Sequence, residues 1–194
     1  MPVITLTPPL LTSASCQLAR RVMDNGFYPR VVIGILNGGA HVARQMMSSF
    51  PEGTLHCEVS ISRPSTVHKQ QSYAHRLLRH IPLWLSDILR IIESRFTEFR
   101  SSHSTLDRIG NLTLPAEVED VLHAGPCPVL IVDDAIDSGA TIQKVRKQLS
   151  ERFPNLDVKV SVITVTTPHP ACDADYYLYH NRTLCRFPWS NDYR

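Results

Sequence analysis

A dense group of polar residues, DDAIDSGAT at positions 133–141, directly follows an apolar run at 129–132. Adjacent carboxylates at a strand end can accept hydrogen bonds from hydroxyls or hold a divalent cation. The hydroxyls and glycine of the second half, at the start of a helix, offer free backbone N–H groups to a phosphate. Together the two halves predict a sugar-phosphate site. Alternatively, Asp137 and Ser138 only cap the helix while the acidic pair faces solvent, although three neighbouring aspartates would then repel one another.

A second turn with glycines, Asn37-Gly38-Gly39, follows the apolar run 31–36 and precedes a helix expected at 40–49. Strand, glycine turn and helix are typical of the start of a βαβ unit, and alone they indicate no ligand. Two other phosphate motifs are excluded, because neither G-x-x-x-x-G-K-[ST] nor G-x-G-x-x-G occurs in the chain. A magnesium phosphatase with Asp133 as nucleophile would leave the glycine-containing half of the first motif unexplained.

The elements that must position these turns alternate along the chain. Helices are expected at 13–25, 40–49, 82–100, 116–123 and 140–152, and strands at 31–36, 55–61, 129–132 and 158–165, with short β-like runs at 176–179 and 184–187. This alternation predicts an α/β fold with a mainly parallel twisted sheet flanked by helices. One domain, 1–194, is expected, with a helical insertion at about 75–123. The apolar face of helix 82–100 could pack on the core, shape an acceptor pocket or pair subunits.

The bulk composition is that of a globular protein, with 43% hydrophobic and 20% charged residues. A net charge of +2 gives no sign of a nucleic-acid binder. The five cysteines are scattered without a C-x-x-C pair, which fits reduced thiols and argues against a zinc site. No stretch approaches the roughly 20 apolar residues of a membrane span, and the N-terminus lacks a secretory pattern, so a cytoplasmic location is expected.

Residues 129–141 (VLIVDDAIDSGAT) resemble the phosphoribosyl pyrophosphate (PRPP) signature of type I phosphoribosyltransferases, which has four apolar residues, two acids and a phosphate loop. The resemblance implies that Asp133 and Asp134 hold the ribose hydroxyls and lie beside a Mg²⁺ ion. It also implies that the 5-phosphate is bound by Asp137, Ser138, Gly139, Ala140 and Thr141. Residues 34–39 resemble the pyrophosphate loop of the same family. This implies a cis peptide at Leu36–Asn37 and PRPP contacts from Leu36, Asn37, Gly38 and Gly39.

In that family a nitrogen of a base displaces pyrophosphate from PRPP, as in purine salvage. Residues 62–69 lie where the family has its flexible catalytic loop, so Arg63 and Lys69 are expected to approach the pyrophosphate; a plain basic surface loop is the alternative. The resemblance implies that Asp137 exchanges a proton with the base. The tail, 168–194, resembles the hood of bacterial xanthine-guanine enzymes, although an edge hairpin packed by aromatics is also open. Base contacts are expected from Ile136, Thr167, Leu184 and Trp189.

Three positions depart from the purine enzymes. Thr167 stands where a lysine reads the purine 6-oxo group, Leu184 where an aromatic ring stacks on the base, and Asn37 where Arg or Lys is usual. Two hypotheses therefore remain. The chain transfers phosphoribosyl from PRPP to a purine or related nitrogen heterocycle, or it is a PRPP- or nucleotide-binding regulatory protein that has lost turnover. A homodimer is expected.

Overall fold

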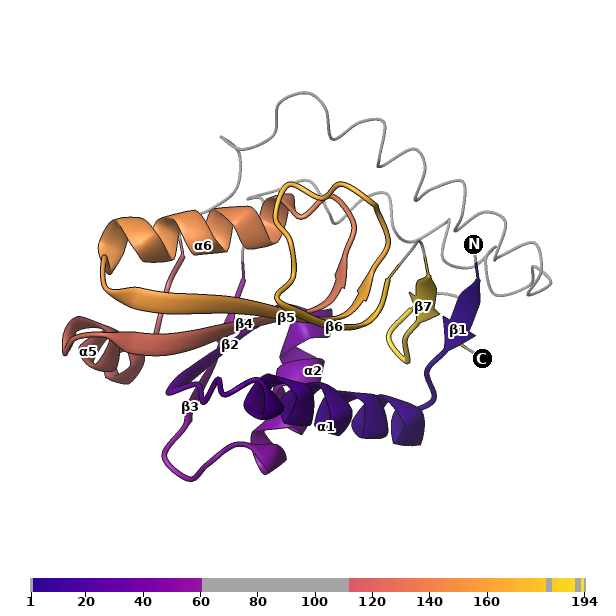
Figure 1. The fold of residues 1–194 in the computed structure, drawn as a ribbon, viewed down its shortest axis with the longest axis horizontal. Helices are drawn as coiled ribbons and strands as arrows, with labels where there is room; N and C mark the ends of the chain where they lie inside the picture. The colour runs from indigo at the N-terminus through magenta and orange to yellow at the C-terminus, as the bar shows by residue number, and fades with distance from the viewer. Residues whose placement is uncertain (1, 61–111, 181–182, 191–192, 194) are drawn as a thin grey trace, which may run out of the picture.

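The computed structural model describes residues 2–60, 112–180, 183–190 and 193. Its main sheet has five strands in the order β3-β2-β4-β5-β6, and every pair is parallel (Figure 1). The strands are β3 (Leu55–Val59), β2 (Val31–Ile35), β4 (Cys127–Ile136), β5 (Leu156–Val165) and β6 (Tyr176–Tyr179). A second, two-stranded parallel sheet joins the two ends of the chain through β1 (Val3–Thr5) and β7 (Leu184–Arg186). The predicted α/β fold with a mainly parallel sheet is confirmed.

Helices cover both faces of the main sheet (Figure 1). Helices α1 (Pro8–Asp24) and α2 (Gly38–Met46), followed by the 3-10 turn η1 (Met47–Ser49), share one apolar core with Leu130 and Val132 of β4. Helices α5 (Ala116–His123) and α6 (Ala140–Arg152) share the other core with Val129 and Ile131. Because successive β4 side chains point to opposite cores, the central strand is apolar at every position from 129 to 132, as expected of a sheet covered on both faces.

The direction in which the chain adds successive strands to the sheet changes between β2 and β4, although all the strands are parallel. From β2 the chain passes through α2 to β3 on one side, whereas from β4 it passes through α6 to β5 on the other. Gly34 of β2 is in register with Val132 of β4, so the two strands reach the same edge of the sheet together. In open α/β sheets ligands bind outside the carboxyl ends of the strands at such a switch point.

Several boundaries differ from those predicted. Helix α1 begins at Pro8 rather than at 13, because proline is tolerated in the first helical turn. Strand β4 continues to Ile136, paired there with Val165, so the acidic pair lies in the strand and not in the following turn. The two β-like runs of the tail lie in different sheets, which excludes the hairpin alternative. Strand β1 was missed, since three residues carry no readable alternation.

Other predictions agree with the structure or fall outside it. Helices α5 and α6 have the predicted bounds, and Ile142, Val145 and Leu149 of α6 are buried as expected. The helix predicted at 82–100 and the catalytic loop expected at 62–69 lie outside the described residues. Within the ranges that the structure describes, no helix is long and apolar enough to cross a membrane.

Candidate functional site

The two glycine-containing motifs meet at the switch point. A Cβ atom on Gly38 would overlap the Asp134 carboxylate, lying 2.7 Å from Oδ1 and nearer still to Oδ2. A Cβ atom on Gly39 would lie 2.6 Å from Asp133 Cα and would also overlap the carbonyl oxygen of Val132. Only glycine therefore allows the first turn of α2 to lie directly against the acidic pair. The positive end of the α2 dipole faces these carboxylates, an arrangement that favours negative charge.

The acidic pair has unusual electrostatics. Asp133 and Asp134 are half-buried neighbours, and the backbone N–H of Asp134 donates to Asp133 Oδ1 at 2.9 Å. Burial, followed by the charge of Asp134, holds the pKa of Asp133 well above its usual range. Burial also raises the pKa of Asp134, although hydrogen bonds to its carboxylate, the first from Trp189, oppose the change. Two such neighbouring carboxylates are stabilised by hydrogen bonds from hydroxyl groups, or by a cation that offsets the repulsion between their charges.

The predicted phosphate loop, residues 137–141, joins β4 to α6. Gly139 is the N-cap of α6 with φ of 74° and has no side chain to cap the helix; the backbone N–H of Ala140 donates to Ser138 Oγ at 3.4 Å. The loop rests on the segment after β5, because Ala171 N–H donates to the carbonyl of Ser138 at 2.8 Å. A Cβ atom on Gly139 would lie 2.8 Å from the nitrogen of Cys172. The alternative in which these residues only cap the helix is contradicted at the acidic pair, which is half-buried and does not face solvent; Ser138 does contact the first helical N–H, although Gly139 occupies the N-cap position.

Asp137 is exposed but held in place by a residue that the sequence analysis missed. The hydroxyl of Thr166 donates to Asp137 Oδ1 at 2.6 Å, and its backbone N–H donates to the carbonyl of Ile136 at 2.9 Å. Thr166 is only 3% exposed. The available signal was its position, because Thr166 directly follows β5, the strand that pairs with β4.

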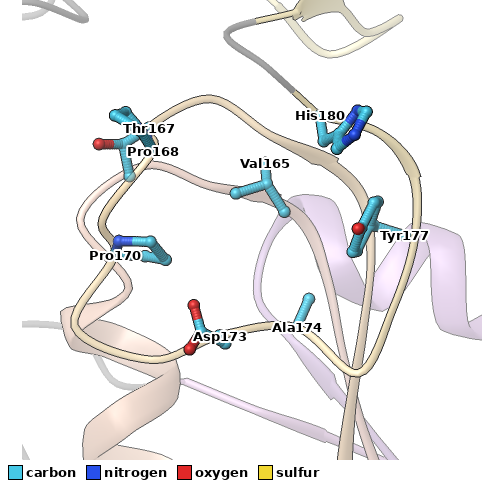
Figure 2. A pocket seen from close by; sticks show the side chains of 8 residues that line it. All are labelled: Val165, Thr167, Pro168, Pro170, Asp173, Ala174, Tyr177 and His180. Atoms are coloured by element: carbon cyan, nitrogen blue, oxygen red, sulfur yellow. The ribbon is translucent and has the colours of Figure 1, made fainter.

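The residues expected to bind a base are not brought together. Thr167 lines a pocket of about 170 Å³ formed by the loop that joins β5 to β6 (Figure 2). The other lining residues are Val165, Pro168, Pro170, Asp173, Ala174, Tyr177 and His180. Ile136 is buried in the core beside α6, and Leu184 is buried in β7, so neither lines this pocket.

Among the described residues that line this pocket there are hydrogen-bond acceptors and rings but no lysine or arginine. Figure 2 shows Tyr177 and His180 across the pocket from Thr167 and Pro168. The Tyr177 and His180 rings are stacked, with centroids 5.4 Å apart and planes at 25°. The pocket thus offers a ring surface, a hydroxyl and the Asp173 carboxylate.

Trp189 contacts the acidic pair instead. Its indole Nε1–H donates to Asp134 Oδ2 at 2.9 Å. Its ring stacks on His41 at the start of α2, with centroids 4.9 Å apart, and on Phe187, with centroids 5.1 Å apart.

Two further expectations concern loops beside the site. The peptide between Leu36 and Asn37 is cis, as the resemblance implied, and the Leu36 side chain is 41% exposed. Arg63 and Lys69, the expected catalytic cations, lie outside the described residues. The part of the chain that the structure describes holds no group of three or more His, Cys, Asp or Glu side chains able to bind a metal.

Comparison with known proteins identifies the fold. No protein-family model matches the chain, and no curated protein matches it in sequence. Among solved structures, a purine phosphoribosyltransferase from Pyrococcus horikoshii is 17% identical with a TM-score of 0.59, covering 98% of this chain and 95% of that one. A xanthine-guanine-hypoxanthine phosphoribosyltransferase from Helicobacter pylori is 12% identical with a TM-score of 0.57, covering 96% and 92%.

A hypothetical protein from Neisseria gonorrhoeae with bound ppGpp is similar to the same extent, at 16% identity and a TM-score of 0.61, covering 97% of this chain and 89% of that one. The chain therefore has the type I phosphoribosyltransferase fold, which these structures share at low sequence identity.

Proposed function

We propose that this protein transfers the phosphoribosyl group of PRPP to a ring nitrogen of a purine or a related heterocycle, with release of pyrophosphate. The observation that carries the proposal is the convergence of the acidic pair, the loop at 137–141 and the glycine-containing turn at 36–39 on one edge of the sheet. This edge is the switch point between β2 and β4, and the fold is that of purine phosphoribosyltransferases.

Each part of PRPP has a matching group in this arrangement. The carboxylates of Asp133 and Asp134 accept hydrogen bonds from the ribose hydroxyls. The N–H groups around Gly139 and the dipole of α6 bind the 5-phosphate. The N–H groups of the turn at 37–39, at the start of α2, bind the pyrophosphate. The C1–O bond then breaks with its electron pair leaving on pyrophosphate, a C1–N bond forms, and the proton of the ring nitrogen passes to Asp137.

A magnesium ion fits the chemistry of the acidic pair. Mg²⁺ is usually bound by one or two carboxylates together with substrate phosphates and water, rather than by a cage of protein ligands. Asp133 and Asp134 supply such carboxylates, and the raised pKa of each reflects burial that a neighbouring cation would offset. When bound with PRPP, the ion would neutralise charge on the leaving pyrophosphate.

A second candidate function is PRPP or nucleotide sensing without turnover. It is favoured by Thr167 and Leu184, which replace the lysine and the aromatic ring of a purine pocket, and by the fold neighbour with bound ppGpp. A sensor would keep the sugar-phosphate groups and need no base pocket.

The experiment measures pyrophosphate release from PRPP with Mg²⁺ across a panel of purines and related heterocycles, together with PRPP affinity by calorimetry. The transferase should release pyrophosphate with at least one base, and Asp134→Asn should weaken PRPP binding and abolish turnover. Tight PRPP binding with no release for any base would favour the sensor. Unchanged kinetics in Asp134→Asn would refute the role given to the acidic pair.

A further inference from the structure

The C-terminal segment reaches the acidic pair through one side chain. Trp189 is half-buried, and its indole Nε1–H donates to Asp134 Oδ2 at 2.9 Å. A hydrogen bond from a neutral donor to a carboxylate is stronger than one between neutral groups. The bond therefore fixes the Asp134 carboxylate, and the bonded oxygen Oδ2 is also the carboxylate atom nearest to where a Cβ on Gly38 of α2 would lie.

The ring of Trp189 is engaged within the protein. It is stacked with His41 at an interplanar angle of 19° and with Phe187 at 5°. Phe187 is itself only 5% exposed. Aromatic stacking adds about 0.5–1.5 kcal/mol per pair beyond the area buried. A ring held by two partners and a hydrogen bond is suited to a fixed position and not to opening for each substrate.

We infer that Trp189 is a positioning residue for the sugar-phosphate half of the site, acting through Asp134, and not a platform on which the base stacks. The inference rests on the proposed function, because it assigns Asp134 to the ribose hydroxyls. With Oδ2 engaged by the indole, the Asp134 carboxylate is held in one orientation toward the ribose hydroxyls. Trp189 does not line the pocket that contains Thr167, which agrees with a role away from the base.

The first test separates the two halves of the site kinetically. Trp189→Phe keeps a ring for His41 and Phe187 but removes the N–H donor. We expect the KM and Kd for PRPP to rise about tenfold, as for loss of a hydrogen bond to a charged group, with the KM for the base unchanged. A normal PRPP affinity, or a rise confined to the KM of the base, would overturn the inference.

The control for the ring contacts is His41→Ala, which removes one stacking partner and keeps the N–H donor. PRPP affinity in this variant should fall less than in Trp189→Phe. If His41→Ala weakened PRPP binding as much as Trp189→Phe, ring packing and not the hydrogen bond would be responsible, and the inference would be wrong.

A spectroscopic test applies even if Trp189→Phe does not fold. The chain has two tryptophans, and Trp84→Phe leaves Trp189 as the source of a single indole N–H signal in ¹⁵N NMR. That signal should move on addition of PRPP with Mg²⁺ and should also move in Trp84→Phe/Asp134→Ala without ligand. An indole signal insensitive to both changes would exclude the contact.

The wild-type titration distinguishes failure of this inference from failure of the proposed function. If the wild-type protein bound no PRPP by calorimetry, the proposed function would be wrong and the inference would fall with it. If the wild type bound PRPP and Trp189→Phe bound it equally well, only the inference would be wrong.

Discussion

Two regions of the molecule are built in different ways: the proposed sugar-phosphate side (residues 36–39 and 133–141) and the pocket at the β5–β6 loop, which we propose as the acceptor side because it contains Thr167. On the sugar-phosphate side, Gly38 and Gly39 lie against the acidic pair and Gly139 lies against Cys172, each without room for a Cβ atom. On the acceptor side, the pocket at the β5–β6 loop is lined by side chains such as Pro168 and Asp173, which are exposed. Backbone packing restricts the first region to a few residue types, whereas the second can change side chains without disturbing the sheet. Under the proposed function, groups that bind PRPP would be set by the backbone packing of the fold, whereas base choice would not.

The largest expected effect is on the sugar-phosphate side. Gly39→Ala would place Cβ 2.6 Å from Asp133 Cα, so α2 must move away from β4. We expect a loss of about 3 kcal/mol in the free energy of unfolding, or about 6–12 °C in Tm, and loss of PRPP binding by calorimetry.

The matched control is Gly53→Ala. Gly53 has φ of 86° with no atom within 4 Å of the added Cβ, so only backbone strain of about 1–2 kcal/mol is expected. Gly53→Ala should bind PRPP normally. If Gly39→Ala also bound PRPP normally, the close packing of α2 on the acidic pair would not matter for ligand binding.

Thr166 lies between the two sides, because it precedes Thr167 of the pocket and its hydroxyl donates to Asp137 of the loop at 137–141. Thr166→Val keeps the shape but removes the hydroxyl that donates to Asp137 at 2.6 Å, leaving that carboxylate free to turn. We expect kcat to fall about tenfold, the cost of one hydrogen bond to a charged group, with the KM for PRPP nearly unchanged. Thr166→Ser keeps the donor and should restore most of the rate. Equal rates for the Val and Ser variants would show that the hydroxyl does not position Asp137.

The same contrast explains how much could be predicted from the sequence. The acidic pair and both glycine turns were found because their residue types are dictated by close backbone approach and by phosphate binding. The Leu36–Asn37 cis peptide followed from the family resemblance. Thr166 and the position of Trp189 were not found, because each depends on a contact between segments far apart in the chain, 29 and 55 residues from the partner aspartate. Strand β1 pairs with β7 across nearly the whole chain, and no local pattern reports such a pairing.

Replacing Asp133 of the acidic pair should have a smaller effect, which is on the thermal stability of the protein. Burial and the neighbouring charge raise the pKa of Asp133, so the folded state holds this proton more strongly than the unfolded state. The stabilising contribution is complete below the unfolded pKa of about 3.9 and is lost as the pH rises through the folded pKa. In metal-free buffer at neutral pH, Asp133→Asn should therefore raise Tm by a few degrees, about 2–4 °C per kcal/mol.

The pH series provides the check on that gain. The advantage of Asp133→Asn over wild type should shrink as the pH falls toward 4, where the aspartate is neutral as well, while PRPP binding by the variant is weak throughout. A variant less stable than wild type at neutral pH would contradict the electrostatic explanation.

The smallest expected effect is on the acceptor side. Thr167→Lys adds the cationic donor that the pocket lining lacks, and a charge-assisted hydrogen bond to a 6-oxo group should raise kcat/KM for hypoxanthine relative to adenine about fivefold. The gain is limited because Asp173 lines the same pocket and can pair with the new ammonium. Thr167→Lys/Asp173→Asn should therefore shift the preference further, and Thr167→Val should not shift it toward hypoxanthine. If PRPP affinity changed along with base preference in these variants, the two sides of the site would not be separable, and the division between fixed sugar-phosphate groups and variable acceptor groups would fail.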